Sequence, residues 1–258
     1  MRNLSKQTLG NFLFVLITLF AFYWFFSRAP IPQDLNYHDF IDSRELFGIP
    51  NFWNVFSNIF FLVVGVVGLY KTLFVQKFYL INEIKIVYSM LFLSCVLIAF
   101  GSAYYHWLPN NWTLFWDRLA MSVAFMALFT IVISEYVSLR VGKQVFIPLV
   151  CAGIASVVYW YVSETQGQGD LRLYALIQFY PLLLISVILV FFKSRYTYAK
   201  SYWAMLFVYG ISKLFEYFDA LVFEYSGLLS GHTIKHIMAA VAVGILLVAY
   251  GKRQLNTD

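Results

Sequence analysis

Long apolar segments alternate with short polar connections along almost the whole chain. Eight of these segments approach the roughly 20 apolar residues that a helix needs to cross a bilayer. They lie at residues 9–27, 51–72, 86–107, 113–135, 145–163, 172–193, 201–225 and 232–250. The strands of a membrane β-barrel would alternate apolar with polar residues, whereas segments such as FFLVVGVVGLY (60–70) are continuously apolar. The pattern predicts an all-α membrane protein: a seven-helix transmembrane bundle plus one N-terminal transmembrane anchor helix.

The same pattern predicts the domain organisation. We expect an N-terminal end and anchor helix at 1–30, an outer loop at 31–50, a seven-helix domain at 51–251 and a tail at 252–258. The apolar core GNFLFVLITLFAFYWFF (10–26) is long for a signal peptide, and no small-residue cleavage site follows it. We therefore expect the first helix to be retained as an anchor.

Composition excludes a water-soluble globular domain, because 61% of the 258 residues are hydrophobic and only 12% are charged. The net charge of +5 does not by itself indicate a nucleic-acid partner, and we expect none. In a membrane protein the positions of the basic residues matter more, because cytoplasmic loops collect Lys and Arg. With the N-terminus inside, the residues on the cytoplasmic side are Arg2, Lys6, Lys71, Lys77, Lys85, Arg140, Lys143, Lys193, Arg195, Lys200, Lys252 and Arg253. Only Arg28, Arg44 and Arg172 fall outside. Both termini are predicted to be cytoplasmic, and the short loops and tails favour a bacterial inner membrane.

Polar residues inside the predicted spans gather at one depth. A polar group within a bilayer is costly unless it is paired, so each polar residue in a span is expected to have a structural or functional role. Given the alternating directions of the helices, the following all fall near the outer ends of four spans: Asn54, Ser57, Asn58, Ser102, His106, Asp117, His232 and His236. This convergence predicts a functional site near the non-cytoplasmic surface.

Three histidines in this group have the spacing of a metal site. His232 and His236 are four residues apart and so share one helix face, and His106 can supply a third ligand. Three imidazoles leave one coordination position open for water, as in catalytic zinc sites, although iron, copper and nickel also accept imidazole. The alternative for the pair alone is two outward-facing or hydrogen-bonded histidines.

Ser102 and Asp117 are the candidate catalytic residues beside this ion. Ser102 precedes His106 by one helical turn and can point toward the ion, or bond back to its own helix. Asp117 can orient a ligand, hold water or move its proton, or instead pair with Arg118.

Other ionisable residues are interpreted as structural. Lys213 and Glu216 are within pairing reach on one helix, with Asp219 a further three residues along. Lys235 can pair with one of these acids. His38, in the outer loop, is expected to be a surface or lid residue, not a metal ligand.

Four sequence blocks resemble the alkaline ceramidase family, which belongs to a wider group of seven-helix membrane hydrolases that includes the adiponectin and progestin receptor relatives. They are NFWNVFSNIFF (51–61), GSAYYH (101–106), Asp117 in FWDRLAMS, and SGHTIKH (230–236). The resemblance covers about residues 37–250. It implies that His106, His232 and His236 bind zinc and that Ser102 and Asp117 complete the catalytic set.

The resemblance also implies the reaction. A membrane lipid, a ceramide-like N-acyl sphingoid, would be hydrolysed to a free base and a fatty acid, with its acyl chain in an apolar cavity between the helices. Eukaryotic members hold calcium through acids that include a glutamate before the FWN motif, where this chain has Asn51; Asp39, Asp42 and Glu45 are nearby. Two alternatives stay open: a receptor or scaffold with a structural metal, and a lipid ester hydrolase.

Overall fold

The protein is an all-α membrane bundle. The computed structural model describes residues 5–256, of which no segment forms a β-strand. The helices are α1 (Lys6–Ser27), η1 (Leu35–His38), α2 (Phe52–Phe56), α3 (Ile59–Phe74), η2 (Asn82–Ile84), α4 (Lys85–Trp107), α5 (Asn111–Val132), a π-helical turn η3 (Ile133–Val137), α6 (Leu139–Thr165), α7 (Arg172–Phe191), α8 (Lys200–Tyr217), α9 (Asp219–Ser226) and α10 (Gly231–Lys252).

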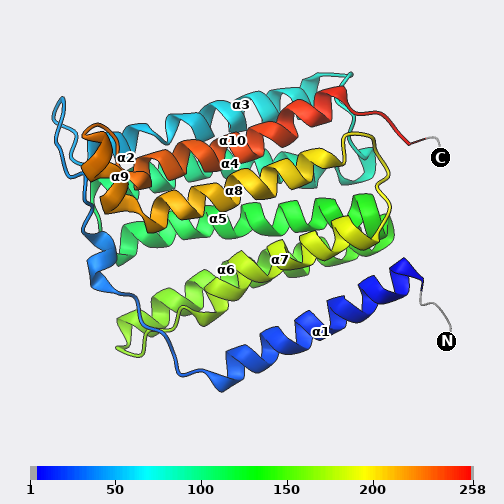
Figure 1. Cartoon of the computed structure of the whole chain (residues 1–258), viewed down its shortest axis with the longest axis horizontal. Helices are drawn as coiled ribbons and strands as arrows, with labels where there is room; N and C mark the ends of the chain where they lie inside the picture. Colours follow the sequence, from blue (N-terminus) through cyan, green and yellow to red (C-terminus); the bar gives the residue numbers. More distant parts are fainter. Residues whose placement is uncertain (1–4, 257–258) are drawn as a thin grey trace.

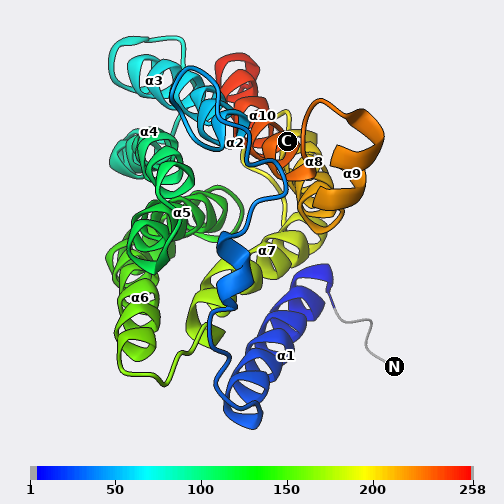
Figure 2. The same cartoon turned by 90° about the vertical axis from the view of Figure 1, so that its left-hand side faces the viewer.

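Seven stretches of the described chain are long and apolar enough to cross a membrane: α1, α2–α3, η2–α4, α5–η3, α6, α7 and α10. The predicted span at 201–225 differs from the structure. Its helix, α8, ends at Tyr217, and the chain turns at Phe218 into the short α9. Three of the 18 residues of α8 are charged, namely Lys200, Lys213 and Glu216. The helix nevertheless runs alongside α10 within the bundle (Figures 1 and 2).

The first core helix is broken between α2 and α3 by its own polar side chains. Ser57 Oγ donates to the carbonyl of Asn54 at 3.1 Å, and Asn58 Nδ2 donates to the same carbonyl at 2.8 Å. Side chains that bond to nearby backbone carbonyls compete with the regular helical ladder. The break turns these polar groups toward the neighbouring helices.

The start of α1 and the end of α10 lie at the same end of the bundle (Figure 1). The loops that join α3 to α4, α5 to α6 and α7 to α8 lie at this end too. The basic residues predicted to be cytoplasmic therefore gather there, except Arg2, which lies outside the described residues. The opposite end carries α2, α9 and the outer loop.

A buried ion pair joins the helices at the basic end. Arg253 Nη1 lies 2.7 Å from Glu135 Oε1, and both side chains are almost fully buried. Tyr202 donates to Glu135 Oε2 at 2.8 Å, and Arg253 Nε donates to the backbone carbonyl of Tyr79 at 2.7 Å. Because breaking such a pair leaves an uncompensated buried charge, this network holds the end of α10 against η3, α8 and the loop before η2.

Helix α1 lies at the edge of the bundle, beside α7 (Figure 2). Thr18 and Tyr180 share a hydrogen bond of 2.7 Å between their hydroxyls. Gly10 lets the two helices approach closely, because an added Cβ would lie 2.6 Å from Cβ of Phe191. Most other side chains of α1 are exposed, as expected of a helix surrounded by lipid.

Candidate metal centre

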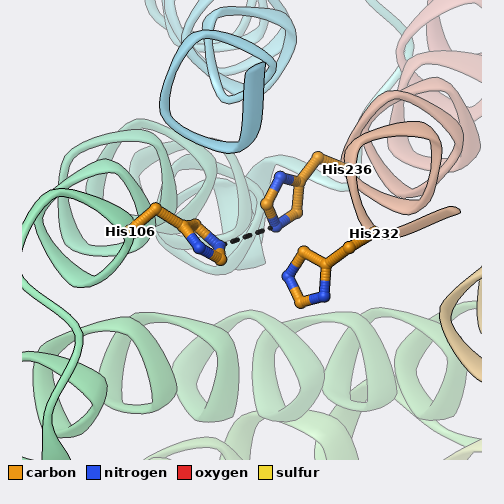
Figure 3. A group of neighbouring side chains, drawn as sticks. All are labelled: His106, His232 and His236. Carbon is orange, nitrogen blue, oxygen red and sulfur yellow. Dashed lines mark hydrogen bonds between the residues drawn. The ribbon is translucent and has the colours of Figure 1, made fainter. Parts of the chain in front are cut away.

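Three histidines meet in the interior at the end of the bundle opposite the basic loops. His106 comes from the last turn of α4, and His232 and His236 come from the first turns of α10. All three are buried, and their rings point toward one another (Figure 3). The ring centroids are 4.8–4.9 Å apart in every pair. The predicted convergence of the three imidazoles is therefore present.

His236 is oriented by a serine from the break between α2 and α3. Ser57 Oγ lies 2.8 Å from Nδ1 of His236, and the single hydroxyl proton of Ser57 is donated to the carbonyl of Asn54. Ser57 must then accept from Nδ1–H, so the lone pair of His236 is on Nε2. This nitrogen lies 3.2 Å from Nε2 of His106, which directs it into the space between the rings.

His106 is held by residues that precede the first core helix. Asn51 adopts a left-handed conformation with φ 49°, which Asn tolerates better than most residues. Its Nδ2 donates to the backbone carbonyl of His106 at 2.8 Å and so caps the end of α4. Phe40, in the outer loop, lies over the centre, with its ring 4.5 Å from that of His106 and 5.4 Å from that of His232.

His232 depends on a close approach between the start of α10 and the end of α8. An added Cβ on Gly231 would lie 2.1 Å from the carbonyl oxygen of Phe215, so no larger residue fits without a shift. The carboxylate of Asp219 accepts from the backbone N–H of His232 at 2.7 Å. A carboxylate at a helix N-terminus satisfies a free N–H and complements the helix dipole.

Lys235 lies 3.2 Å from Nε2 of His232 and 2.8 Å from Oε1 of Glu216. An ammonium can only donate, so it contacts His232 while Nε2 carries the lone pair. An ion bound through Nε2 would use that lone pair, and an ion bound through Nδ1 would require a proton on Nε2. Ion binding by His232 would therefore release Lys235, which would keep Glu216 as its partner.

Ser102 and Asp117 open onto one cavity with His236. The cavity has a volume of about 300 Å³, and the Ser102 hydroxyl lies near the Asp117 carboxylate. Asp117 is buried, and its Oδ1 has no hydrogen-bond partner among the described residues. A smaller cavity of about 100 Å³ with an almost wholly apolar lining, including Leu91, Phe125 and Met205, adjoins it deeper in the bundle.

The three histidines could hold a metal ion. One nitrogen from each ring lies within 4.8 Å of the others, and ligands about 2.1 Å from a tetrahedral zinc ion are about 3.4 Å apart. Small side-chain rotations would thus bring all three nitrogens onto one ion. Nδ1 of His106 is buried and has no hydrogen-bond partner in residues 5–256, so no hydrogen bond at this nitrogen opposes its use as a ligand. Neutral imidazoles suit zinc and several other transition metals.

The calcium site implied by the resemblance has no support in the described residues, where no second group of three candidate ligands occurs. Asp42 is paired with Arg44 at 2.7 Å. Asp39 and Glu45 are exposed, and the amide of Asn51 is used to cap α4.

The predictions for the other ionisable residues can be compared with their contacts. Lys213 and Lys235 both pair with Glu216, which confirms the predicted pairing of these residues. His38 is outside the histidine group and lies between Tyr105 and Asn111, 3.0 Å from a polar atom of each. The alternative pairing of Asp117 with Arg118 is absent from the described ion pairs.

Three roles in the site were not predicted from the sequence: Phe40 over the rings, Asn51 as the cap of α4, and Ser57 as the partner of His236. Ser57 had a signal, because it was among the polar residues at the depth of the histidines. Phe40 had none, since loop aromatics are common in this chain.

No protein-family model matches the chain, and comparison with curated proteins and with solved structures found no significant match. The resemblance to alkaline ceramidases therefore stays a prediction from the quoted sequence blocks.

Proposed function

We propose that this protein is a zinc-dependent intramembrane hydrolase that cleaves the amide of a ceramide-like N-acyl lipid to a fatty acid and a free base. The proposal combines the donor set of the candidate metal centre with the sequence blocks that resemble alkaline ceramidases.

The observation that carries the proposal is the buried Asp117 carboxylate, whose Oδ1 has no hydrogen-bond partner among the described residues. It lines the same cavity as Ser102 and His236. A structural metal site needs only its ligands, and a buried carboxylate without full hydrogen bonding is costly. Its presence beside the histidines is best explained by a chemical task.

The chain's own residues can divide the reaction between them. When bound, zinc would supply Lewis acidity and lower the pKa of a bound water to about 7. Asp117 takes a proton from the attacking water as the new C–O bond forms. The Ser102 hydroxyl donates to the carbonyl oxygen as it gains negative charge. Asp117 then returns the proton to the amide nitrogen as the C–N bond breaks, which releases the amine and the fatty acid.

The shape of the interior supports a lipid substrate. The cavity with Asp117 would take the head and amide, and the adjoining apolar cavity would take part of the acyl chain. We place the basic end of the bundle and both termini in the cytoplasm, following the distribution of Lys and Arg. The active site then lies near the non-cytoplasmic surface of the membrane, which we take to be a bacterial inner membrane.

One experiment separates the three functions. Purified full-length protein is incubated in detergent with fatty-acid-labelled ceramide and with a matched ester lipid, each with and without a metal chelator. Chelator-sensitive release from ceramide supports the amide hydrolase, and release from the ester alone would make the protein an ester hydrolase. No release of fatty acid from any lipid tested, neutral or acidic, by zinc-loaded protein would refute both hydrolases and leave a receptor or scaffold.

A further inference from the structure

Arg118 is a buried cation in a spanning helix without a carboxylate partner among the described ion pairs. Only 6% of the residue is exposed. Its guanidinium lies over the rings of Trp160 and Tyr174, 4.2 Å and 5.0 Å from their centroids, and Nη2 donates to Oε1 of Gln33 at 2.7 Å. Nη1 is buried and has no hydrogen-bond partner in residues 5–256. An unpaired charge inside a membrane is costly, so the presence of Arg118 at this position requires an explanation.

The cavity that Arg118 lines carries an excess of positive charge. Its lining contains three cations, Arg118, Lys213 and Lys235, against two carboxylates, Asp117 and Glu216. Glu216 is shared by the two lysines, so Asp117 is the only acid left to face Arg118. The surplus is one positive charge before any metal is counted, and a divalent ion would raise it.

We infer that the lipid bound here carries an anionic group close to its amide, and that Nη1 of Arg118 donates to that anion. This inference rests on the proposed function for the position of the amide beside Asp117. Arg118 is the next residue on α5, and its bond to Gln33 ties it to the outer loop, at the head-group end of the cavity. The deeper cavity, by contrast, has no charged lining residue.

A carboxylate and a phosphate would both satisfy Arg118, because a guanidinium forms charge-assisted hydrogen bonds with either. The substrate class is therefore an N-acyl lipid with an acidic head, such as an N-acyl amino acid or a phosphorylated N-acyl amine. A neutral head group would leave Nη1 unpaired and the surplus charge uncompensated.

Three matched lipids test the inference on the full chain in detergent micelles. N-oleoylglycine carries a carboxylate, N-oleoylethanolamine carries a neutral hydroxyl, and N-oleoylethanolamine phosphate carries a phosphate on the same acyl amide. Equilibrium binding and oleate release are both measured. Wild-type protein should bind at least one acidic lipid about tenfold or more tightly than the neutral one, the size expected of a charge-assisted hydrogen bond.

The variant Arg118→Gln should remove this difference, because it keeps hydrogen-bonding capacity but not the charge. Arg172→Gln is the matched control: Arg172 also lies over an aromatic ring near this end of the bundle, but it pairs with Asp170 and does not line the cavity. It should keep the preference for an acidic lipid.

Equal binding of all three lipids by the wild-type protein would overturn the inference, and this comparison needs no variant. A preference that persists in Arg118→Gln, or that Arg172→Gln loses equally, would also overturn it. The proposed function fails separately: a preference for an acidic lipid without oleate release would support anion recognition and refute hydrolysis. Oleate release without a preference for an acidic lipid would support hydrolysis and refute anion recognition by Arg118.

Discussion

The contact between Ser57 and His236 makes a prediction that separates metal binding from general stability. Ser57→Ala removes the hydroxyl that lies 2.8 Å from Nδ1 of His236. Both residues are buried, so water does not replace the lost partner freely. We expect the His236 ring to lose its orientation and the basicity that this bond confers on Nε2.

The magnitude follows from the kind of bond that is lost. Removing the hydrogen-bond partner of a metal-ligating histidine typically weakens metal affinity by about 10- to 100-fold, which corresponds to about 1.4–2.7 kcal/mol. That range agrees with the roughly 1–3 kcal/mol that it costs to leave a buried donor, here Nδ1–H of His236, without a partner. The three ligands remain, so zinc in excess should still load the variant fully.

The assay is a zinc competition against a chromogenic chelator of known affinity, with purified full-length protein in detergent. Ser156→Ala is the matched control, because Ser57 and Ser156 are each 3% exposed and Ser156 bonds only to a carbonyl of its own helix, at 2.7 Å. Ser156→Ala should leave zinc affinity unchanged. An unchanged affinity in Ser57→Ala, or an equal loss in both variants, would refute the role assigned to Ser57.

Three further predictions concern chemistry, packing and pH. Asp117→Asn should keep zinc but lower turnover by about 10²–10⁴-fold, the usual contribution of a general acid–base group; near-normal turnover in a single-turnover assay would contradict this. Gly231→Ala should lower thermal stability, because its Cβ would meet a backbone carbonyl of α8 at 2.1 Å, whereas Gly210→Ala, with open space around it, should not; equal melting temperatures would count against the packing argument. The hydrogen bond from Arg172 lowers the pKa of Asp170, in the α6–α7 loop, from 3.8 to about 2. The pair therefore stabilises the folded chain fully above pH 4 and loses this contribution as the pH falls toward 2. The difference in unfolding free energy between wild type and Asp170→Asn should shrink between pH 4 and pH 2. A difference that stays constant down to pH 2 would contradict this prediction.

The sequence was sufficient to predict the spanning helices and the convergence of the three histidines. The bilayer requires about 20 apolar residues per span, which makes each crossing visible as a continuous segment. Polar groups within a span are rare enough that His106, Asp117 and His236 stand out. The HxxxH spacing of α10 then places two rings on one face of a helix.

Side-chain partners and loop positions could not be predicted in the same way. Asp117 and Arg118 are adjacent in sequence, yet the guanidinium turns to Gln33 and Trp160, because neighbouring residues on a helix point in different directions. The contact of Lys235 with His232 likewise depends on where α8 places Glu216. The end of α8 at Tyr217 was hidden, since the apolar residues of α9 extend the same hydropathy pattern.

The most direct test of the central claim is the zinc content of purified full-length protein, measured by elemental analysis after loading with zinc and removal of excess ion. Because three imidazoles from α4 and α10 meet within reach of one ion, the wild-type chain should retain one zinc ion and His236→Ala should retain none. A wild-type chain that keeps no zinc, or a folded His236→Ala variant that keeps one ion per chain, would contradict the assignment of these histidines as a metal centre.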